Sequence, residues 1–378
     1  MSDRHHFDVI VVGGGIAGAS VAYFLAEQGV GDVLVLEREA HPAYHSTGRS
    51  AATLAELDTN ATLMRLKVLS APFLRDPPTG FAENAILRPI GVLALFPEPA
   101  WSAIQEARPL LEAAGLPFTL LSAAQAIARV PVLAAGEIAG AVLVPRDGRI
   151  DVHELLSSYR RAARRHGMSE RFGVEVKQIL VSGGRCTGVV TGAGERLRAR
   201  WVVNAAGAWA GRIGALAGAL PVPLTPHRRT IVTFAAPDGV EPSDWPFVTS
   251  ESHLLYFAPE PGGLLLSPMD EDPSEPCDAQ PDELTIARGL ARLETLAPRL
   301  VPRALQRRWS GLRTFVPDRV PVVGEDPRVK GFFWLAGQGG CGIETSPTLS
   351  RIAAELLVLG GCDRFAIETL APSRFASS

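Results

Sequence analysis

The first forty residues contain the feature that most limits how this chain can fold. An apolar run, Val9–Val12, leads into the glycine-rich sequence Gly13-Gly14-Gly15-Ile16-Ala17-Gly18. Good helix-forming residues follow from Ile16 to Gln28, and a second apolar run, Val33–Leu36, leads to the acidic Glu37. This order predicts a strand, a tight turn, a helix and a second parallel strand, which together indicate a doubly wound α/β domain.

Each glycine of this G-x-G-x-x-G motif has a physical role in binding a dinucleotide. Gly13 permits the tight turn, Gly15 lets the backbone approach a pyrophosphate, and Gly18 lets the helix pack closely on the strand. The N-terminus of the helix offers N–H groups and the positive end of its dipole to the phosphates. Glu37 can accept hydrogen bonds from ribose hydroxyls, so the motif predicts a dinucleotide site, either for FAD or for NAD.

Later segments predict a second, different kind of sheet. The apolar runs Trp201–Asn204 and Phe332–Ala336 each lead into small residues, as the first strand does. Short strands separated by proline-rich turns fill the segments between, which is typical of an antiparallel sheet. We therefore expect a discontinuous nucleotide-binding domain with a mixed-sheet substrate domain inserted between its pieces. The first comprises residues 1–87, 145–225 and 309–378, and the second comprises 88–144 and 226–308.

Composition and charge argue against several classes of protein. The formal net charge of −3 offers no basic field for nucleic acid. No apolar run reaches about eighteen residues, so we expect no transmembrane segment, while peripheral membrane contact stays open. The chain shows no His, Cys and Asp spacing for a metal, and no Cys-x-x-Cys among its four cysteines, so a reduced, cytoplasmic setting without a metal fits best. We expect His5-His6 to be a disordered terminal pair and the proline-broken acidic stretch Asp270–Glu283 to be a solvated loop.

Several short segments, spread in order over nearly the whole chain, resemble those of one known family. This family is the D-amino-acid oxidase type (DAO-type) of FAD-dependent oxidoreductases, and within it the pattern is most similar to bacterial D-arginine dehydrogenases. The matching segments are Val11–Ser20, Leu36–Glu39, Tyr44–Ala52, Val203–Trp209, Gly311–Arg313, Pro317-Asp318, Pro321–Gly324, Phe332–Trp334 and Gln338–Ile343. The resemblance implies an α/β fold with a Rossmann-like FAD-binding domain, an inserted mixed antiparallel-sheet substrate domain, and FAD as a non-covalent cofactor.

The resemblance also implies which residues contact FAD. Ala17, Glu37 and Arg38 are assigned to the adenosine half, and Val176 lies beside the adenine. His45 is expected to be a neutral hydrogen-bonding residue rather than a covalent flavin anchor. The expected contacts with the pyrophosphate, the second nucleotide strand and the flavin are Ser46, Thr47, Gly48, Arg49, Ser50, Ala51, Ala52, Thr53, Ala206, Gly207, Trp209, Gly339, Gly340, Cys341, Gly342, Ile343 and Glu344.

A helix is expected to begin beside the flavin. Ser346-Pro347 resembles an N-cap followed by proline at the first helical position. The N-terminus of that helix would stabilise negative charge on the flavin when the ring is reduced. Cys341, just before it, is expected to be a small buried thiol without a function of its own.

On the substrate side the resemblance implies a carboxylate grip. Arg313, Arg229 and Tyr256 match the positions that hold the substrate carboxylate, and guanidinium groups suit this because they bind carboxylates through two parallel hydrogen bonds. Thr53 and Gly340 complete the expected catalytic set.

Two departures from the pattern bear on the substrate's side chain. The segment Thr53–Asp58 lacks an aromatic lid residue, and Val92 stands where a D-arginine dehydrogenase has an acid. These differences favour an apolar or smaller side chain, although Glu56 and Asp58 could meet a basic group from the lid side.

The implied reaction is oxidation of a D-amino acid to its imino acid, with hydride passing from Cα to flavin N5 and water then releasing a keto acid and ammonia. Three alternatives stay open: an enzyme for glycine, sarcosine or another N-substituted amino acid, a 2-hydroxy-acid dehydrogenase, and a flavin-stabilised protein without turnover. The expected partner is a small amino acid. The electron acceptor (oxygen, a quinone or another carrier) and the oligomeric state are left open.

Overall fold

The computed structural model describes residues 6–376. Strand β1 (His6–Val12), helix α1 (Ile16–Glu27) and strand β2 (Val33–Glu37) form the predicted N-terminal unit, with β1 and β2 paired in parallel. Of the expected disordered pair, His5 lies outside the described residues. His6 instead begins β1 and pairs with Arg198, because the neighbouring strand extends far enough to bond it.

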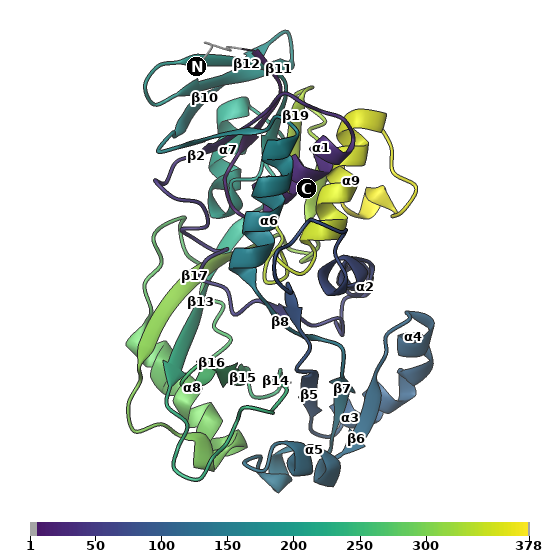
Figure 1. Ribbon diagram of the computed structural model, residues 1–378, viewed down its shortest axis with the longest axis vertical. Coiled ribbons are helices and arrows are strands. Elements are labelled where there is room, and N and C mark those ends of the chain that lie inside the picture. The colour runs from purple at the N-terminus through teal and green to yellow at the C-terminus, as the bar shows by residue number, and fades with distance from the viewer. Residues whose placement is uncertain (1–5, 377–378) are drawn as a thin grey trace.

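The first sheet is built around β1 and has eight strands (Figure 1). Its main order is β10-β11-β12-β1-β2-β9, while β19 pairs in parallel with β12 and β18 pairs with β19. Both strands that the later apolar runs predicted therefore belong to this sheet. Besides β1 and β2, the strands are β9 (Ser169–Phe172), β10 (Val176–Ser182), β11 (Arg185–Thr191), β12 (Arg196–Asn204), β18 (Val322–Glu325) and β19 (Phe332–Ala336).

Both faces of the central strands are buried, which explains their continuous apolar sequences. Val9 and Val11 pack into one core, with residues of helices on that face, whereas Ile10 and Val12 pack into a second core on the other face. The helices of the first face are α1, α2 (Ala61–Arg75), α6 (Val152–Arg165) and α9 (Ser346–Leu359), and α7 (Ala210–Ala217) covers the second.

The second large sheet is mixed and lies beyond the end of the first (Figure 1). Only its β14–β5 pair is parallel among the described pairings, and the long antiparallel pair of β13 and β17 forms one edge of the sheet. In order across the sheet the strands are β17 (Arg307–Phe315), β13 (Thr225–Phe234), β16 (Gly263–Ser267), β15 (Leu255–Glu260), β14 (Phe247–Ser250), β5 (Val92–Phe96), β7 (Gly140–Val144) and β6 (Thr119–Ser122). This mixed sheet confirms the predicted fold class, while the division of the chain into domains stays a prediction.

Smaller elements complete the molecule. A short sheet in the order β3-β8-β4 connects the two large ones. Within residues 6–376, none of the helices is long and apolar enough to cross a membrane. The remaining bounds are β3 (Thr53–Leu54), β4 (Leu87–Arg88), β8 (Gly148–Ile150), α3 (Ala100–Glu106), α4 (Arg108–Ala113), α5 (Ala123–Arg129) and α8 (Glu283–Leu296).

The start of α9 differs from the prediction. Thr345, not Ser346, is the N-cap residue, and Pro347 is the second helical residue. The hydroxyl of Ser346 donates to the carbonyl of Ile343, and that of Thr345 donates to the carbonyl of Cys341. Both hydroxyls therefore bond the loop that precedes the helix, and the N–H of Thr348 in the first turn donates to the Ser70 hydroxyl of α2 at 3.3 Å rather than to the N-cap residue.

Candidate active site

A cavity of about 450 Å³ begins where β1, β2 and β12 end against the start of α1, and it reaches β13 and β17 of the mixed sheet. Most of the residues expected at the cofactor and substrate line it. They are Gly13, Gly15, Ala17, Glu37, Arg38, Ser46, Thr47, Arg49, Ser50, Val176, Ala206, Gly207, Trp209, Arg229, Arg313, Gly339, Gly340, Gly342 and Ile343. The expected site residues outside this lining are Gly18, Gly48, Ala51, Ala52, Thr53, Tyr256, Cys341 and Glu344.

The glycine loop is shaped by close backbone contacts. A Cβ on Gly18 would lie 1.9 Å from the carbonyl oxygen of Gly13, so only glycine lets α1 pack here. Gly13 has φ +117°, which favours glycine. A Cβ on Gly15 would lie 3.1 Å from the Thr47 hydroxyl, which is a tight contact. The N-cap residue Gly15 has no side chain to cap α1, and the Thr47 hydroxyl accepts the N–H of Ile16 at 3.0 Å, so the N-terminus of α1 opens on the cavity beside Thr47 and fits a pyrophosphate.

Glu37 holds the loops at the end of β2. One carboxylate oxygen accepts the N–H of Gly14 at 2.7 Å, and the other accepts the N–H of Glu39 at 2.9 Å. These contacts fix the glycine loop against β2, and the carboxylate also lines the cavity. A ribose contact by Glu37 stays a prediction.

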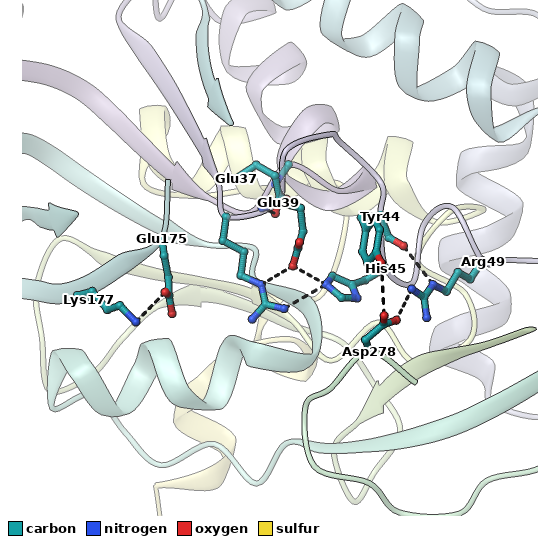
Figure 2. A network of polar contacts seen from close by, with 10 residues as sticks. Glu37, Glu39, Tyr44, His45, Arg49, Glu175, Lys177 and Asp278 are labelled. Carbon is teal, nitrogen blue, oxygen red and sulfur yellow. Dashed lines mark hydrogen bonds and ion pairs between the residues drawn. The ribbon is translucent and has the colours of Figure 1, made fainter. Parts of the chain in front are cut away.

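A polar cluster lies at the end of the cavity where the adenosine half of FAD is expected (Figure 2). The Arg38 guanidinium lies 3.7 Å from the centre of the Trp209 ring. Glu39 accepts from Arg38 at 2.9 Å and contacts His45 Nε2 at 2.8 Å. The hydrogen bond with His45, which is the largest effect, holds the pKa of Glu39 below its usual value against the opposing effect of burial, and the charge of Arg38 adds to the lowering. Sequence reasoning missed Glu39, whose position two residues after Glu37 was the available signal.

Arg49 connects the cofactor side to the acidic stretch (Figure 2). Its guanidinium donates to the carbonyls of Ala279 and Ser310 at 3.0 and 3.1 Å and forms an ion pair with Asp278. Tyr44 donates to the same carboxylate at 3.4 Å. Most residues of the acidic stretch are exposed or half-buried, as expected of a solvated loop, but Arg49 and Arg229 also bind two of its carboxylates.

The antiparallel pairing of β13 with β17 brings together the two arginines that are expected to bind the substrate. Arg229 pairs with Gly311, and His227 pairs with Arg313. Because side chains alternate along strands, Arg229 and Arg313 lie on the same face. Arg313 Nη2 lies 3.5 Å from the Tyr256 hydroxyl, and Arg313 has no ion-pair partner within residues 6–376. Its guanidinium fills the space beside Gly340, where a Cβ would lie 2.8 Å from Nη1.

Arg229, by contrast, is already bound. It is 4% exposed, and it donates to the carbonyl of Asp270 at 2.9 Å and to the carboxylate of Glu271 at 2.8 Å. Burial, followed by the charge of Arg313, lowers the pKa of Arg229 to about 10. Glu271 also binds Arg319 at 2.9 Å. Sequence reasoning missed Glu271 and Arg319, because only the folded chain places the acidic stretch beside β13.

Glu56 and Asp58, the two acids of the segment expected to form the lid, both make ion pairs within the protein. Glu56, 1% exposed, forms an ion pair with Arg75, which also binds Asp147. Asp58 binds Lys67 at 2.8 Å. Neither lid acid is thus available to a basic substrate, which corrects that expectation.

Four other residues were expected near the reacting atoms. The buried Oγ1 of Thr53 has no hydrogen-bond partner within the described chain, as expected of a group that meets a ligand. Glu344 instead binds Lys67 at 3.2 Å and accepts the N–H of Ala55. Burial raises the pKa of Cys341 to about 12, consistent with an inert thiol. Val92 packs in an apolar cluster with Tyr256 and does not line the cavity.

Comparison with known proteins gives consistent matches over almost the full chain. A protein-family model described as FAD dependent oxidoreductase matches residues 8–356. The glycine oxidase of Geobacillus kaustophilus is 28% identical over 367 residues, which covers 93% of each chain. The mitochondrial regulatory subunit of pyruvate dehydrogenase phosphatase from Mus musculus is 25% identical, but the chain spans only 41% of its length.

Solved structures also match this fold over almost the full chain. L-proline dehydrogenase from P. horikoshii superposes with a TM-score of 0.87 at 23% identity and covers 99% of both chains. The crystal structure of the G. kaustophilus glycine oxidase gives a TM-score of 0.82 at 26% identity, over 98% of this chain and 99% of that one. These relatives support the broad resemblance stated above and not the narrower one to D-arginine dehydrogenases.

Proposed function

Because the chain belongs to the family of FAD-dependent oxidoreductases and uses FAD as its cofactor, we propose that it oxidises the amine of a small amino acid with one carboxylate. The observation that supports this most is Arg313, a cation without an ion-pair partner in the described chain, on the same cavity as the glycine loop. When bound, FAD accepts a hydride, that is two electrons and a proton, from the substrate.

The protein's own contribution is mainly to hold the substrate carboxylate and to orient the substrate. Arg313 binds the carboxylate through its planar fork, and the Tyr256 hydroxyl beside it offers a further donor. Fixing the carboxylate at two points aligns the C–H bond next to the amine, which lowers the entropic part of the barrier. The lone pair of the deprotonated substrate amine assists departure of the hydride from the adjacent carbon. The apparent pKa of the reaction therefore belongs largely to the substrate amine.

Two substrate classes fit this arrangement. A D-amino acid with a small or apolar side chain follows from the motif resemblance and from the ion pairs of Glu56 and Asp58, which leave neither acid for a basic side chain. Glycine or an N-substituted glycine is the second candidate, and the similarity to glycine oxidase favours it.

Anaerobic flavin reduction tests the proposal. The holoenzyme is mixed with glycine, sarcosine, D-alanine, L-alanine, D-leucine and D-lactate, and flavin bleaching is followed in a stopped-flow instrument. We expect rapid bleaching by at least one amine substrate and none by D-lactate. Bleaching by D-lactate alone would contradict the proposal in favour of hydroxy-acid oxidation, and bleaching by no compound in a wider amino-acid panel would contradict amine oxidation.

A further inference from the structure

Two acids neutralise part of the positive charge around the carboxylate-binding arginines. Glu271 lies between Arg229 and Arg319, at 2.8 and 2.9 Å. Asp270 accepts both the N–H and the hydroxyl of Thr230, the residue after Arg229. Arg229 lines the cavity, whereas Glu271 does not.

The charges of this group sum to one positive charge. Arg229, Arg313 and Arg319 contribute three positive charges, while Asp270 and Glu271 contribute two negative charges. Arg313 carries the charge that no ion pair offsets within residues 6–376. A substrate with one carboxylate balances this group, and a second carboxylate would find Arg229 already bound.

We propose that Glu271 is a specificity-determining residue that restricts the enzyme to monocarboxylate substrates, a role that rests on the proposed amino-acid oxidation. It occupies the Nη2 group of Arg229 that a second substrate carboxylate would otherwise use. Bringing such a carboxylate near Glu271 also places two like charges together, which is unfavourable in a partly desolvated site.

Removing the charge of Glu271 while keeping its shape should therefore admit dicarboxylates. Glu271→Gln retains an oxygen that can accept from Arg229 and raises the charge of the group to two. Sarcosine and iminodiacetate differ only by one carboxylate, as do D-alanine and D-aspartate, so each pair measures the selectivity. We expect the dicarboxylate-to-monocarboxylate ratio of kcat/KM to rise at least about tenfold in the variant holoenzyme. Glu275→Gln is the control, since Glu275 lies on the same stretch, is 89% exposed and pairs with Arg212 instead.

A binding measurement separates this proposal from the proposed function. Acetate and malonate are titrated against oxidised holoenzyme, and the change in the flavin spectrum reports binding without turnover. Glu271→Gln should tighten malonate relative to acetate about tenfold, even if the true substrate is not an amine. Arg319→Gln should act in the opposite direction, because it lowers the charge of the group and leaves Glu271 to Arg229 alone. Unchanged malonate-to-acetate ratios in both variants would overturn the role of Glu271, and Arg319→Gln decides the matter if the first variant loses FAD.

Discussion

Replacing Arg313 with methionine tests the substrate grip directly. Losing a two-pronged ionic hydrogen bond should cost about 3 kcal/mol of transition-state stabilisation, since hydrogen bonds to charged groups contribute about 1.5–3 kcal/mol each. That corresponds to a fall in kcat/KM of roughly one hundredfold. Lysine at this position should restore little, because a point charge does not reproduce the planar fork.

The fold should be unaffected, because Arg313 has no ion-pair partner in the described chain and contacts Tyr256 only at 3.5 Å. FAD content and Tm should therefore match the native protein. Arg229→Met is the matched contrast, since it leaves the Asp270 carbonyl without its donor and Glu271 bound by Arg319 alone. That variant should be destabilised by about 1–3 kcal/mol as well as impaired.

Anaerobic flavin reduction gives kcat/KM for each variant, and thermal unfolding with bound-flavin absorbance gives stability. Amino-acid amides, which lack the carboxylate, should react poorly with the native enzyme and lose much less in Arg313→Met. Near-native kcat/KM for a carboxylate substrate in Arg313→Met would refute the reasoning, because the carboxylate would then be held elsewhere.

Four further outcomes are expected. Gly340→Ala should lower kcat/KM while FAD stays bound, since the new methyl would lie 2.8 Å from Arg313 Nη1 and displace the guanidinium; flavin content and kinetics measured together check this. Val92→Glu should leave the activity on D-lysine relative to D-leucine unchanged, because Val92 packs in an apolar cluster and does not line the cavity, and a ratio raised by an amount on the order of 1–3 kcal/mol would place the residue beside the substrate. Burial and the adjacent Glu56 raise the pKa of Asp147 to about 9, so its contribution to stability is complete below the usual value of 3.8 and is lost as the pH rises toward 9. Asp147→Asn should flatten that decline in Tm, and an equally steep decline would contradict the assignment. FAD should be released by acid or heat, and flavin that stays with the precipitated protein would instead indicate a covalent link.

Patterns that act locally were predicted well from the sequence. The first strand ends at Val12 as predicted, and α1 ends within one residue of its prediction. Continuous apolar runs identify strands buried on both faces, and the spacing of the glycines depends only on neighbouring residues. The glycine loop could therefore be placed from its own spacing, whereas Arg38 and the residues from Gly339 onward were expected at the cofactor only because of the family resemblance.

Contacts between distant segments could not be predicted in this way. Glu56 pairs with Arg75 and Asp58 pairs with Lys67, and both cations lie on α2. The sequence did not indicate these ion pairs, so both acids were expected to be free. The charge of the acidic stretch predicts a solvated loop. It does not indicate that Glu271 and Asp278 each bind an arginine that the fold brings beside them. Charge pairing of this kind depends on three-dimensional position rather than on sequence spacing.

The cofactor cavity is assembled from segments that are far apart in the chain, and this has a consequence for biosynthesis. The glycine loop follows β1, but the flavin-side wall comes from Gly339–Ile343, which follows β19. During synthesis a nascent chain therefore has the phosphate-binding half of the site long before the other half exists. FAD capture must come late, after the ribosome has released most of the polypeptide. Since a ligand stabilises only the state that binds it, cellular flavin supply should influence how many newly made chains survive proteolysis.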